Sequence, residues 1–158
     1  MELRKIDKTN LWEILDLSVK EEQTDFVDTN TQSILEAYAA VASGDVALPF
    51  GIYHDGRPVG FVMFGYGQTG DPQEPRVAAG NYCIWRFMIG RSCQRQGLGR
   101  RALALSLEYL RTFPCGRADC CWLSYEPDNQ GARALYRSAG FAENGERCGE
   151  EIVAVKRL

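Results

Sequence analysis

A glycine-rich stretch at the start of a predicted helix places the strongest constraint on how this chain can fold. It reads Gln-Arg-Gln-Gly-Leu-Gly-Arg over residues 94–100. A strand-like, aromatic-rich run precedes it at 82–89, and a segment with apolar stripes follows it at 98–113. Glycines at a helix start let the backbone approach a ligand, and free N–H groups at the positive end of the helix dipole favour a phosphate. We therefore expect residues 94–100, here called the phosphate cradle, to bind a pyrophosphate group.

Two other phosphate-binding motifs fit this stretch less well. Residues 97–102 satisfy the G-x-G-x-x-A pattern of dinucleotide-binding folds, and Asp119 lies at a suitable distance in sequence for a ribose contact. In those folds the strand runs almost directly into the first glycine, whereas residues 90–96 separate the two here. A Walker loop needs Gly-Lys-Ser/Thr, which the sequence lacks. Taken alone, the glycine pair also fits a helix start without a ligand.

A second motif strengthens the ligand-binding interpretation. It follows the strand-like run 120–125 and reads Asn-x-x-Ala-x-x-Leu-Tyr-x-x-x-Gly-Phe over residues 129–141. The pattern Gln-x-x-Gly-x-Gly followed by this second motif, each at a strand-to-helix junction, resembles the GCN5-related N-acetyltransferase (GNAT) superfamily. The clear resemblance spans residues 82–141. It implies an enzyme that binds acetyl-CoA and moves the acetyl group to an amine.

Composition and length indicate an ordinary soluble globular protein. With 158 residues, we expect one domain over 1–158. Hydrophobic residues make up 45%, no apolar run reaches membrane-spanning length, and the N-terminus lacks the apolar core of a signal peptide, so we predict a cytoplasmic protein without a membrane partner. The net charge of −3 argues mildly against nucleic acid. With one histidine and no C-x-x-C among six cysteines, we predict reduced thiols and no metal site.

The predicted elements follow the order βααβββαβαββ, which indicates an α/β (α+β) fold with a mixed, mostly antiparallel sheet flanked by helices. Asp55-Gly56 predicts a tight hairpin turn, and the segment 67–80, rich in Gly, Pro and charge, predicts a flexible connection. A helix beginning at Asn30 or Thr31 and another over 98–113 are expected. By resemblance this is the GNAT fold, in which two parallel strands splay apart and admit the thioester.

The resemblance also implies how acetyl-CoA is held. Backbone groups of Phe87, Met88 and Ile89 would pair with the pantetheine arm and form an oxyanion hole, although they would equally serve to complete the sheet. Asn129 would contact the pantetheine or cap its own helix. The pyrophosphate would lie on the phosphate cradle, where the expected contacts are Gln94, Arg95, Gln96, Gly97, Gly99 and Arg100.

Tyr136 matches the position of the family's general acid, which would also place it beside acetyl-CoA. A phenol near the leaving sulfur can protonate the departing thiolate, whereas the alternative is a core aromatic. The base is less clear, because Trp85-Arg86 stand where some polyamine acetyltransferases have a carboxylate. Glu126 is the first candidate, unless it is only a turn residue. The others would act through water and are Glu22, Asp25 and Glu150.

Four carboxylates in the run 21–28 suggest the acceptor. Such a run is commonly a solvated loop, but this one, with 123–129 and 145–150, resembles bacterial diamine, spermidine and spermine N-acetyltransferases. We therefore expect direct acetyl transfer to a polyamine in a ternary complex, bound by Glu21, Glu22, Asp25 and Glu150. The alternatives are an aminoglycoside, an amino acid, a protein N-terminus, or a non-catalytic acyl-CoA sensor. The resemblance also leaves a homodimer open, because this family often dimerises.

Overall fold

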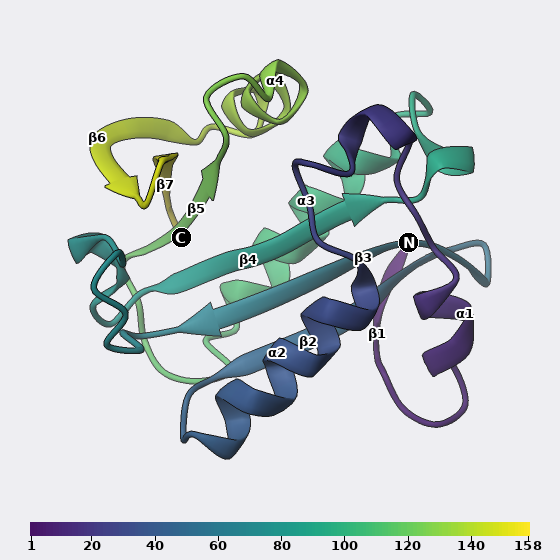
Figure 1. The fold of residues 1–158 in the computed structure, drawn as a ribbon, viewed down its shortest axis with the longest axis horizontal. Coiled ribbons are helices and arrows are strands. Elements are labelled where there is room, and N and C mark those ends of the chain that lie inside the picture. Colours follow the sequence, from purple (N-terminus) through teal and green to yellow (C-terminus); the bar gives the residue numbers. More distant parts are fainter.

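A sheet of seven strands forms the centre of the protein, with helices on both faces (Figure 1). The computed structural model describes all residues from 1 to 158. Three short 3₁₀ helices are η1 (Glu21–Gln23), η2 (Arg76–Ala78) and η3 (Arg91–Cys93). The order of strands and α-helices is the predicted one, and the predicted fold class is confirmed. In chain order these elements are β1 (Glu2–Lys5), α1 (Leu11–Leu15), α2 (Asn30–Ala42), β2 (Ala47–His54), β3 (Arg57–Tyr66), β4 (Tyr82–Ile89), α3 (Leu98–Leu110), β5 (Cys120–Tyr125), α4 (Gln130–Ser138), β6 (Ala142–Cys148) and β7 (Glu151–Arg157).

The sheet is antiparallel except at one junction, between β4 and β5. Its strand order is β1-β2-β3-β4-β5-β7-β6, so β7 lies between β5 and β6. β4 and β5 run parallel and pair only at Tyr82 with Cys121 and at Cys83 with Trp122. Beyond these two pairs the strands diverge, which confirms the predicted splayed parallel strands. On its other edge β4 stays paired with β3, but the register shifts and leaves Trp85 without a partner, a β-bulge where the divergence begins.

Two apolar clusters hold the helices to the two faces of the sheet. The larger one packs α3 and Tyr136 of α4 against one face, with Leu103 and Leu110 fully buried. The smaller one packs Ile14 of α1 and Ala37 of α2 against the opposite face. Because successive side chains of a strand point to opposite faces, the central strands contribute to both clusters. None of the helices has the length and apolar surface that crossing a bilayer requires.

Of the two predicted helix boundaries, the start of α2 at Asn30 is confirmed and the end of α3 differs. The N-cap of α2 is Thr29, whose hydroxyl accepts a hydrogen bond at 3.2 Å from a backbone N–H in the first turn. Asn30 is buried instead and donates to the carbonyl of Ile14 at 2.8 Å, which ties α2 to α1. α3 ends at Leu110 and not at Phe113, because Phe113 adopts a left-handed φ of 53° that does not continue a helix.

The segment 67–80 carries defined structure and is not the simple flexible connection that its composition predicts. It contains η2, whose Ala78 is fully buried beside Trp122 and Val153. Immediately after it, the side chain of Asn81 accepts two hydrogen bonds, at 3.1 and 3.0 Å, from backbone N–H groups at the start of β5. These contacts hold the segment against the base of the β4–β5 junction.

The close approach of β3 to β4 gives a first prediction. A Cβ added at Gly60 would lie 2.4 Å from the backbone oxygen of Met88, a separation that real Cβ atoms do not reach. We expect Gly60→Ala to lower the free energy of unfolding by about 1–3 kcal/mol, because β4 must shift to accommodate the methyl group. For a domain of this size, each kcal/mol lowers Tm by roughly 2–4 °C.

The matched control is Gly65→Ala on the same strand, where the nearest atoms to an added Cβ lie 3.6 and 3.8 Å away. Thermal unfolding of both variants by circular dichroism checks the prediction. Equal melting temperatures for the two would show that the contact between Gly60 and Met88 does not limit stability.

Candidate active site

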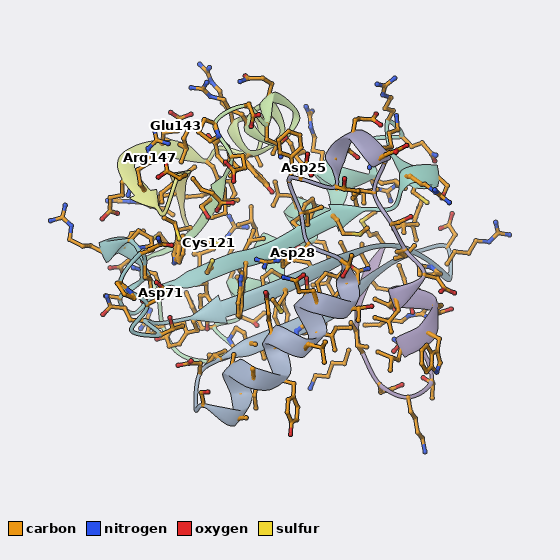
Figure 2. The ribbon with its side chains drawn as sticks, in the orientation of Figure 1. Asp25, Asp28, Asp71, Cys121, Glu143 and Arg147 are labelled. Carbon is orange, nitrogen blue, oxygen red and sulfur yellow. The ribbon has the colours of Figure 1, made fainter.

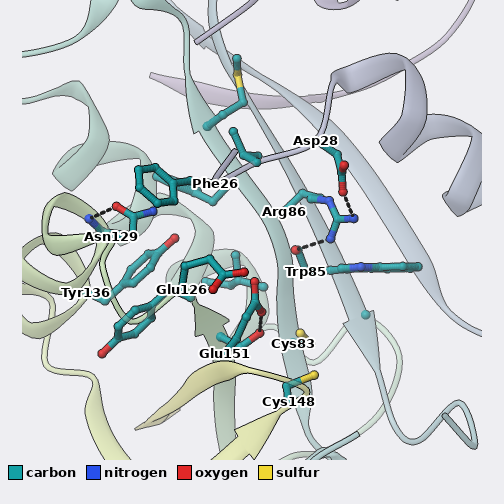
Figure 3. Close-up of a pocket in the computed structure, with 18 of the residues that line it drawn as sticks. Phe26, Asp28, Cys83, Trp85, Arg86, Glu126, Asn129, Tyr136, Cys148 and Glu151 are labelled. Atoms are coloured by element: carbon teal, nitrogen blue, oxygen red, sulfur yellow. Dashed lines mark hydrogen bonds and ion pairs between the residues drawn. The ribbon is translucent and has the colours of Figure 1, made fainter. Parts of the chain in front are cut away.

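A cleft with a volume of about 1240 Å³ opens where β4 and β5 diverge. Its walls come from residues 19–28, α2, the outer part of β4, β5, α4 and the start of β7. Figure 3 shows this cleft, with Tyr136, Glu126 and Glu151 on one side and Arg86 and Asp28 on the other. The cleft therefore joins groups that are far apart in the sequence at the one place where the sheet lacks strand pairing.

The phosphate cradle presents unpaired backbone N–H groups. No hydrogen bond within the protein uses the N–H groups of residues 94–100. Gly97 is the N-cap of α3 with a φ of 74°, a conformation that favours glycine, and no side chain caps the helix. Seven consecutive free donors at a helix start suit a pyrophosphate, so the cradle fits the phosphates of CoA. Gln94, Arg95 and Gly99 also line the cleft, whereas Gln96, Gly97 and Arg100 lie in the cradle outside that lining.

The outer part of β4 supplies a second set of free backbone groups. Phe87, Met88 and Ile89 all line the cleft. Residues of β4 beyond Cys83 pair with β3 on one edge only, because no register pair joins them to β5. Alternate N–H and C=O groups on the open edge are therefore available for a ligand, as expected for binding of a pantetheine arm. The carbonyl of Ile89 already accepts a hydrogen bond from the Gln94 side chain at 2.9 Å.

Tyr136 packs in the core and also lines the cleft. Its ring packs between Tyr125 and Phe141, with centroid separations of 5.7 and 6.1 Å. Its side chain nevertheless lines the cleft, and its hydroxyl makes no hydrogen bond within the protein. Burial raises the pKa of the Tyr136 phenol, and the nearby negative charge of Glu151 raises it further. The phenol therefore stays protonated at neutral pH and can donate a proton.

Asn129 caps its helix, which is one of its two predicted roles, and it also lines the cleft. Its side-chain oxygen accepts a hydrogen bond from the N–H of Ala132 at 3.1 Å and so caps α4. Its side-chain nitrogen donates to no group in the protein, and the residue lines the cleft. The cap fixes the amide orientation, which leaves the nitrogen free for a carbonyl of a bound ligand.

The part of the cleft outside the phosphate cradle is strongly acidic. It is here called the acceptor side, because Glu22 and Asp25, two predicted acceptor-binding residues, lie there. Nine carboxylates line the cleft against three basic side chains. Figure 2 shows Asp25 and Asp28 on the segment that crosses the sheet, and Asp71 at the far end. The carboxylates are Glu22, Asp25, Asp28, Glu36, Asp45, Asp71, Glu74, Glu126 and Glu151, and the basic residues are Lys20, Arg86 and Arg95. A cation is therefore the favoured occupant of this side.

The predicted acceptor-binding residues divide between the cleft and the outer surface. Glu22 and Asp25 line the cleft and make no hydrogen bonds within the protein. Glu21 is exposed and lies outside the cleft. Glu150 is exposed in the turn before β7 and lines a separate small pocket, so the structure does not bring it to the acceptor side. Glu126 borders both pockets, and its carboxylate makes no hydrogen bond within the protein.

Sequence reasoning missed Glu151, which lies beside Glu150 in the chain. As the first residue of β7, Glu151 turns its half-buried side chain into the cleft, where its carboxylate accepts a hydrogen bond from the Ser124 hydroxyl. The alternation of side chains along a strand is the signal that identifies Glu151. Residues two apart share a face, and Val153 on the same face is buried. To use this signal, one must know where the strand begins, and the sequence defines that boundary only to within a residue or two.

Arg86 meets acidic partners, as its position on a buried strand requires. Its guanidinium donates to Asp28 at 2.5 Å and to Glu36 at 2.9 Å, and its side chain is only 19% exposed. It also donates to the carbonyl of Trp85 at 3.2 Å. Arg86 therefore neutralises part of the acidic lining and holds Asp28 in place over β4.

The acidic segment, residues 18–28, is tied down along its length. The carbonyl of Ser18 accepts a hydrogen bond from the N–H of Arg91 at 2.8 Å. Gln23 accepts from the side chain of Gln94 at 2.7 Å. Together with the ion pair of Asp28, these contacts fix the segment over the cleft. Gln94 joins the phosphate cradle to the acceptor side.

Comparisons with known proteins agree with this geometry. The model of the acetyltransferase (GNAT) family matches residues 9–141. A spermine/spermidine N(1)-acetyltransferase of Bacillus subtilis (strain 168) is 29% identical over 158 residues, which covers 99% of this chain and 97% of that protein. A crystal structure of the aminoglycoside acetyltransferase AAC(6')-Ib with coenzyme A superposes with a TM-score of 0.76 at 19% identity, covering 98% of this chain and 93% of that one. The crystal structure of PaiA N-acetyltransferase from Thermoplasma acidophilum with coenzyme A superposes with a TM-score of 0.68 at 14% identity. The match covers 99% of this chain and 98% of that one.

The fold and the cleft are thus those of an acyltransferase, with the cleft at the junction where β4 and β5 diverge. The chain belongs to the acetyltransferase (GNAT) family. It is an N-acetyltransferase that uses acetyl-CoA as its co-substrate.

The phosphate cradle gives the second prediction. A Cβ at Gly99 would lie 3.7 Å from Ile89 and from Leu135, which is ordinary contact, so a larger residue is accommodated without strain. Gly99→Asp should abolish CoA binding, because its carboxylate would repel the pyrophosphate at the helix start. The fold should survive, since an acidic group there suits the helix dipole. Titration calorimetry with CoA measures the effect.

Gly99→Ala serves as the control for folding, with the melting temperature compared across all three proteins. Tight CoA binding by a folded Gly99→Asp variant would contradict the assignment of the cradle. Binding of NAD in place of CoA would instead support the dinucleotide-binding interpretation of the same glycines.

Proposed function

We propose that the acceptor is a polyamine, such as spermidine or spermine. The observation that carries this proposal is the excess of carboxylates in the cleft, nine against three basic side chains. A polyamine bears several ammonium groups along a flexible chain, so it suits carboxylates spread along a groove. The similarity to a protein named spermine/spermidine N(1)-acetyltransferase supports the same substrate class.

The acetyl group is transferred directly between the two ligands in a ternary complex. The phosphate cradle and the free edge of β4 open into the same cleft as the acidic side, so both ligands have room in one cavity. A covalent acetyl-enzyme would need an activated nucleophile, and only two thiols, Cys83 and Cys148, line the cleft. Burial raises the pKa of both thiols, which keeps them in the unreactive protonated form.

In this scheme Tyr136 is the general acid. The amine nitrogen attacks the thioester carbonyl, and the Tyr136 phenol donates its proton to the leaving sulfur. Of Phe87, Met88 and Ile89, the residues whose backbone N–H groups face the open edge of β4 stabilise the oxyanion. Amines are protonated at neutral pH, so a carboxylate must also take a proton from the acceptor. The two carboxylates that Figure 3 places beside Tyr136 are Glu126 and Glu151.

An aminoglycoside is the second candidate acceptor, because it too is a polycation and the AAC(6')-Ib structure shares this fold. A thiol-release assay with acetyl-CoA and a panel of amines separates the two. Spermidine and spermine should show higher kcat/KM than kanamycin, a simple monoamine or an amino acid. A preference for any of the other acceptors would overturn the polyamine proposal, and the absence of turnover with every amine would favour a sensor.

The third prediction concerns the general acid. Tyr136→Phe keeps the ring and its packing but removes the proton donor. We expect kcat to fall by about 10²–10⁴-fold, with CoA affinity and Tm unchanged. The matched control is Tyr109→Phe on α3, whose ring is packed against Phe50 and Phe64 and which does not line the cleft.

Steady-state kinetics, with a single-turnover experiment to confirm that chemistry limits the rate, measures the effect. A Tyr136→Phe variant with the kcat of the unmodified protein under those conditions would remove Tyr136 from the role of acid.

The fourth prediction concerns the acidic segment. Glu22 and Asp25 are exposed carboxylates without partners in the protein, so each should contribute about 0.2–1 kcal/mol to binding one ammonium group. Replacing them together by Gln and Asn should raise KM for spermine by roughly 2- to 30-fold. KM for a monoamine should rise less, because it makes fewer ion pairs. The effect should shrink as salt is added.

The charge-matched control is Glu108→Gln with Asp119→Asn, two exposed carboxylates outside the cleft. Initial rates over a range of spermine concentrations give KM for both double variants. An unchanged KM in the Glu22 and Asp25 variant would show that this part of the acidic segment is only a solvated surface.

A further inference from the structure

Glu151 is a cleft carboxylate with a defined position at the start of a strand. It begins β7, where it pairs with Cys148 of β6, and the pairing of β7 with β5 begins at the next residue, Ile152. The Ser124 hydroxyl of β5 donates to one of its carboxylate oxygens, Oε2. Its other oxygen, Oε1, has no hydrogen-bond partner in the protein, and the residue lines the cleft. One oxygen is therefore anchored and the other is open to a ligand.

Glu151 also acts electrostatically on the Tyr136 phenol. After burial, its negative charge is the largest cause of the raised pKa of that phenol. Glu126 precedes Pro127 at the mouth of the cleft and also borders the outer pocket. Glu126 has no partner to orient it, so it is less well placed to receive a proton at a defined position.

We propose that Glu151, oriented by Ser124, is the catalytic residue that binds the reacting ammonium group of the acceptor and takes its proton. The assignment rests on the proposed transfer to an amine but not on the choice of polyamine. It gives β7 a catalytic function in addition to its place in the sheet. Ser124 then acts as a positioning residue.

The proton balance of the step is complete with these groups. The open oxygen of Glu151 accepts one proton from R–NH₃⁺, which leaves a free lone pair on nitrogen. That lone pair forms the C–N bond to the thioester carbonyl, and the C–S bond breaks as the Tyr136 phenol gives its proton to sulfur. The second proton lost by nitrogen restores the phenol, and Glu151 releases its proton to water. The net products are the acetamide, free CoA thiol and one proton.

The charges around Glu151 bear on its pH dependence. Its titratable neighbours are Glu126 just after β5, Tyr136 on α4, its strand partner Cys148 on β6, and Cys83 on β4. The phenol and both thiols have raised pKa values because they are buried, so they are uncharged at neutral pH. Asp71, Glu74 and Arg86 act on these thiols from the surrounding walls.

The test is the pH dependence of kcat/KM for Glu151→Gln, measured by thiol release with the best amine of the panel. The substitution keeps the shape of the side chain, and Ser124 can still donate to the amide oxygen. We expect a loss of about 10²–10⁴-fold at neutral pH. The loss should shrink as the pH rises, because solvent then deprotonates the amine and the missing carboxylate matters less.

Two further variants and a control separate the outcomes. Glu151→Asp, which keeps the charge on a shorter side chain, should recover part of the lost activity, and Glu108→Gln on the exposed face of α3 should behave as the unmodified protein. Glu126→Gln should lose less activity than Glu151→Gln. A larger loss in Glu126→Gln than in Glu151→Gln would move the proton acceptor to Glu126.

Two results for Glu151→Gln overturn the inference. One is an unchanged pH profile with unchanged activity. The other is the same fold-loss at every pH together with a lowered Tm, which would make the Glu151–Ser124 contact structural. Because the amine panel is measured first on the unmodified protein, a failed polyamine preference is detected separately and leaves this experiment in place with another amine.

Discussion

The divergence of β4 from β5 is the constraint on which the rest of the site depends. Two residue pairs join these strands, and then the backbone of β4 continues with one edge open. Unpaired N–H and C=O groups inside a protein cost free energy unless a ligand or water satisfies them. The open edge therefore makes a site for an extended ligand with amide groups, and the cradle at α3 continues it with free N–H groups for phosphates.

One partly buried cation, Arg86, organises the charges of the cleft near β4. It sits in the middle of that strand and pairs with Asp28 and Glu36. Breaking such a pair from either side would leave a partly buried charge without compensation. The same guanidinium offsets part of the negative charge of the lining near β4, and free carboxylates remain along the acidic segment and beside Tyr136.

The sequence predicts the order of the elements, the splayed strands and the cradle because local patterns carry these features: glycine spacing, apolar periodicity and turn residues. It also predicts that Arg86 needs an acidic partner, since burial of an unpaired charge is costly. It does not predict Glu36, which lies 50 residues away and reaches Arg86 only through the packing of α2 on the sheet. The place of Glu151 in the cleft is not predicted for another reason. Glu150 and Glu151 are neighbours of the same type, and the sequence does not show which of them begins β7.

The acidic segment adds no strand to the sheet. Polar contacts at Ser18, Gln23 and Asp28 and the packing of Val19 and Val27 on the smaller apolar cluster hold it over the cleft. The segment that we propose binds the acceptor is therefore held by loop contacts, whereas the strand with the open edge, β4, is held by its pairing with β3. Substitutions in this segment can therefore change which amine binds while the phosphate cradle and the open edge of β4 stay the same. The condition is that the partners of Gln94 and Arg86 are kept.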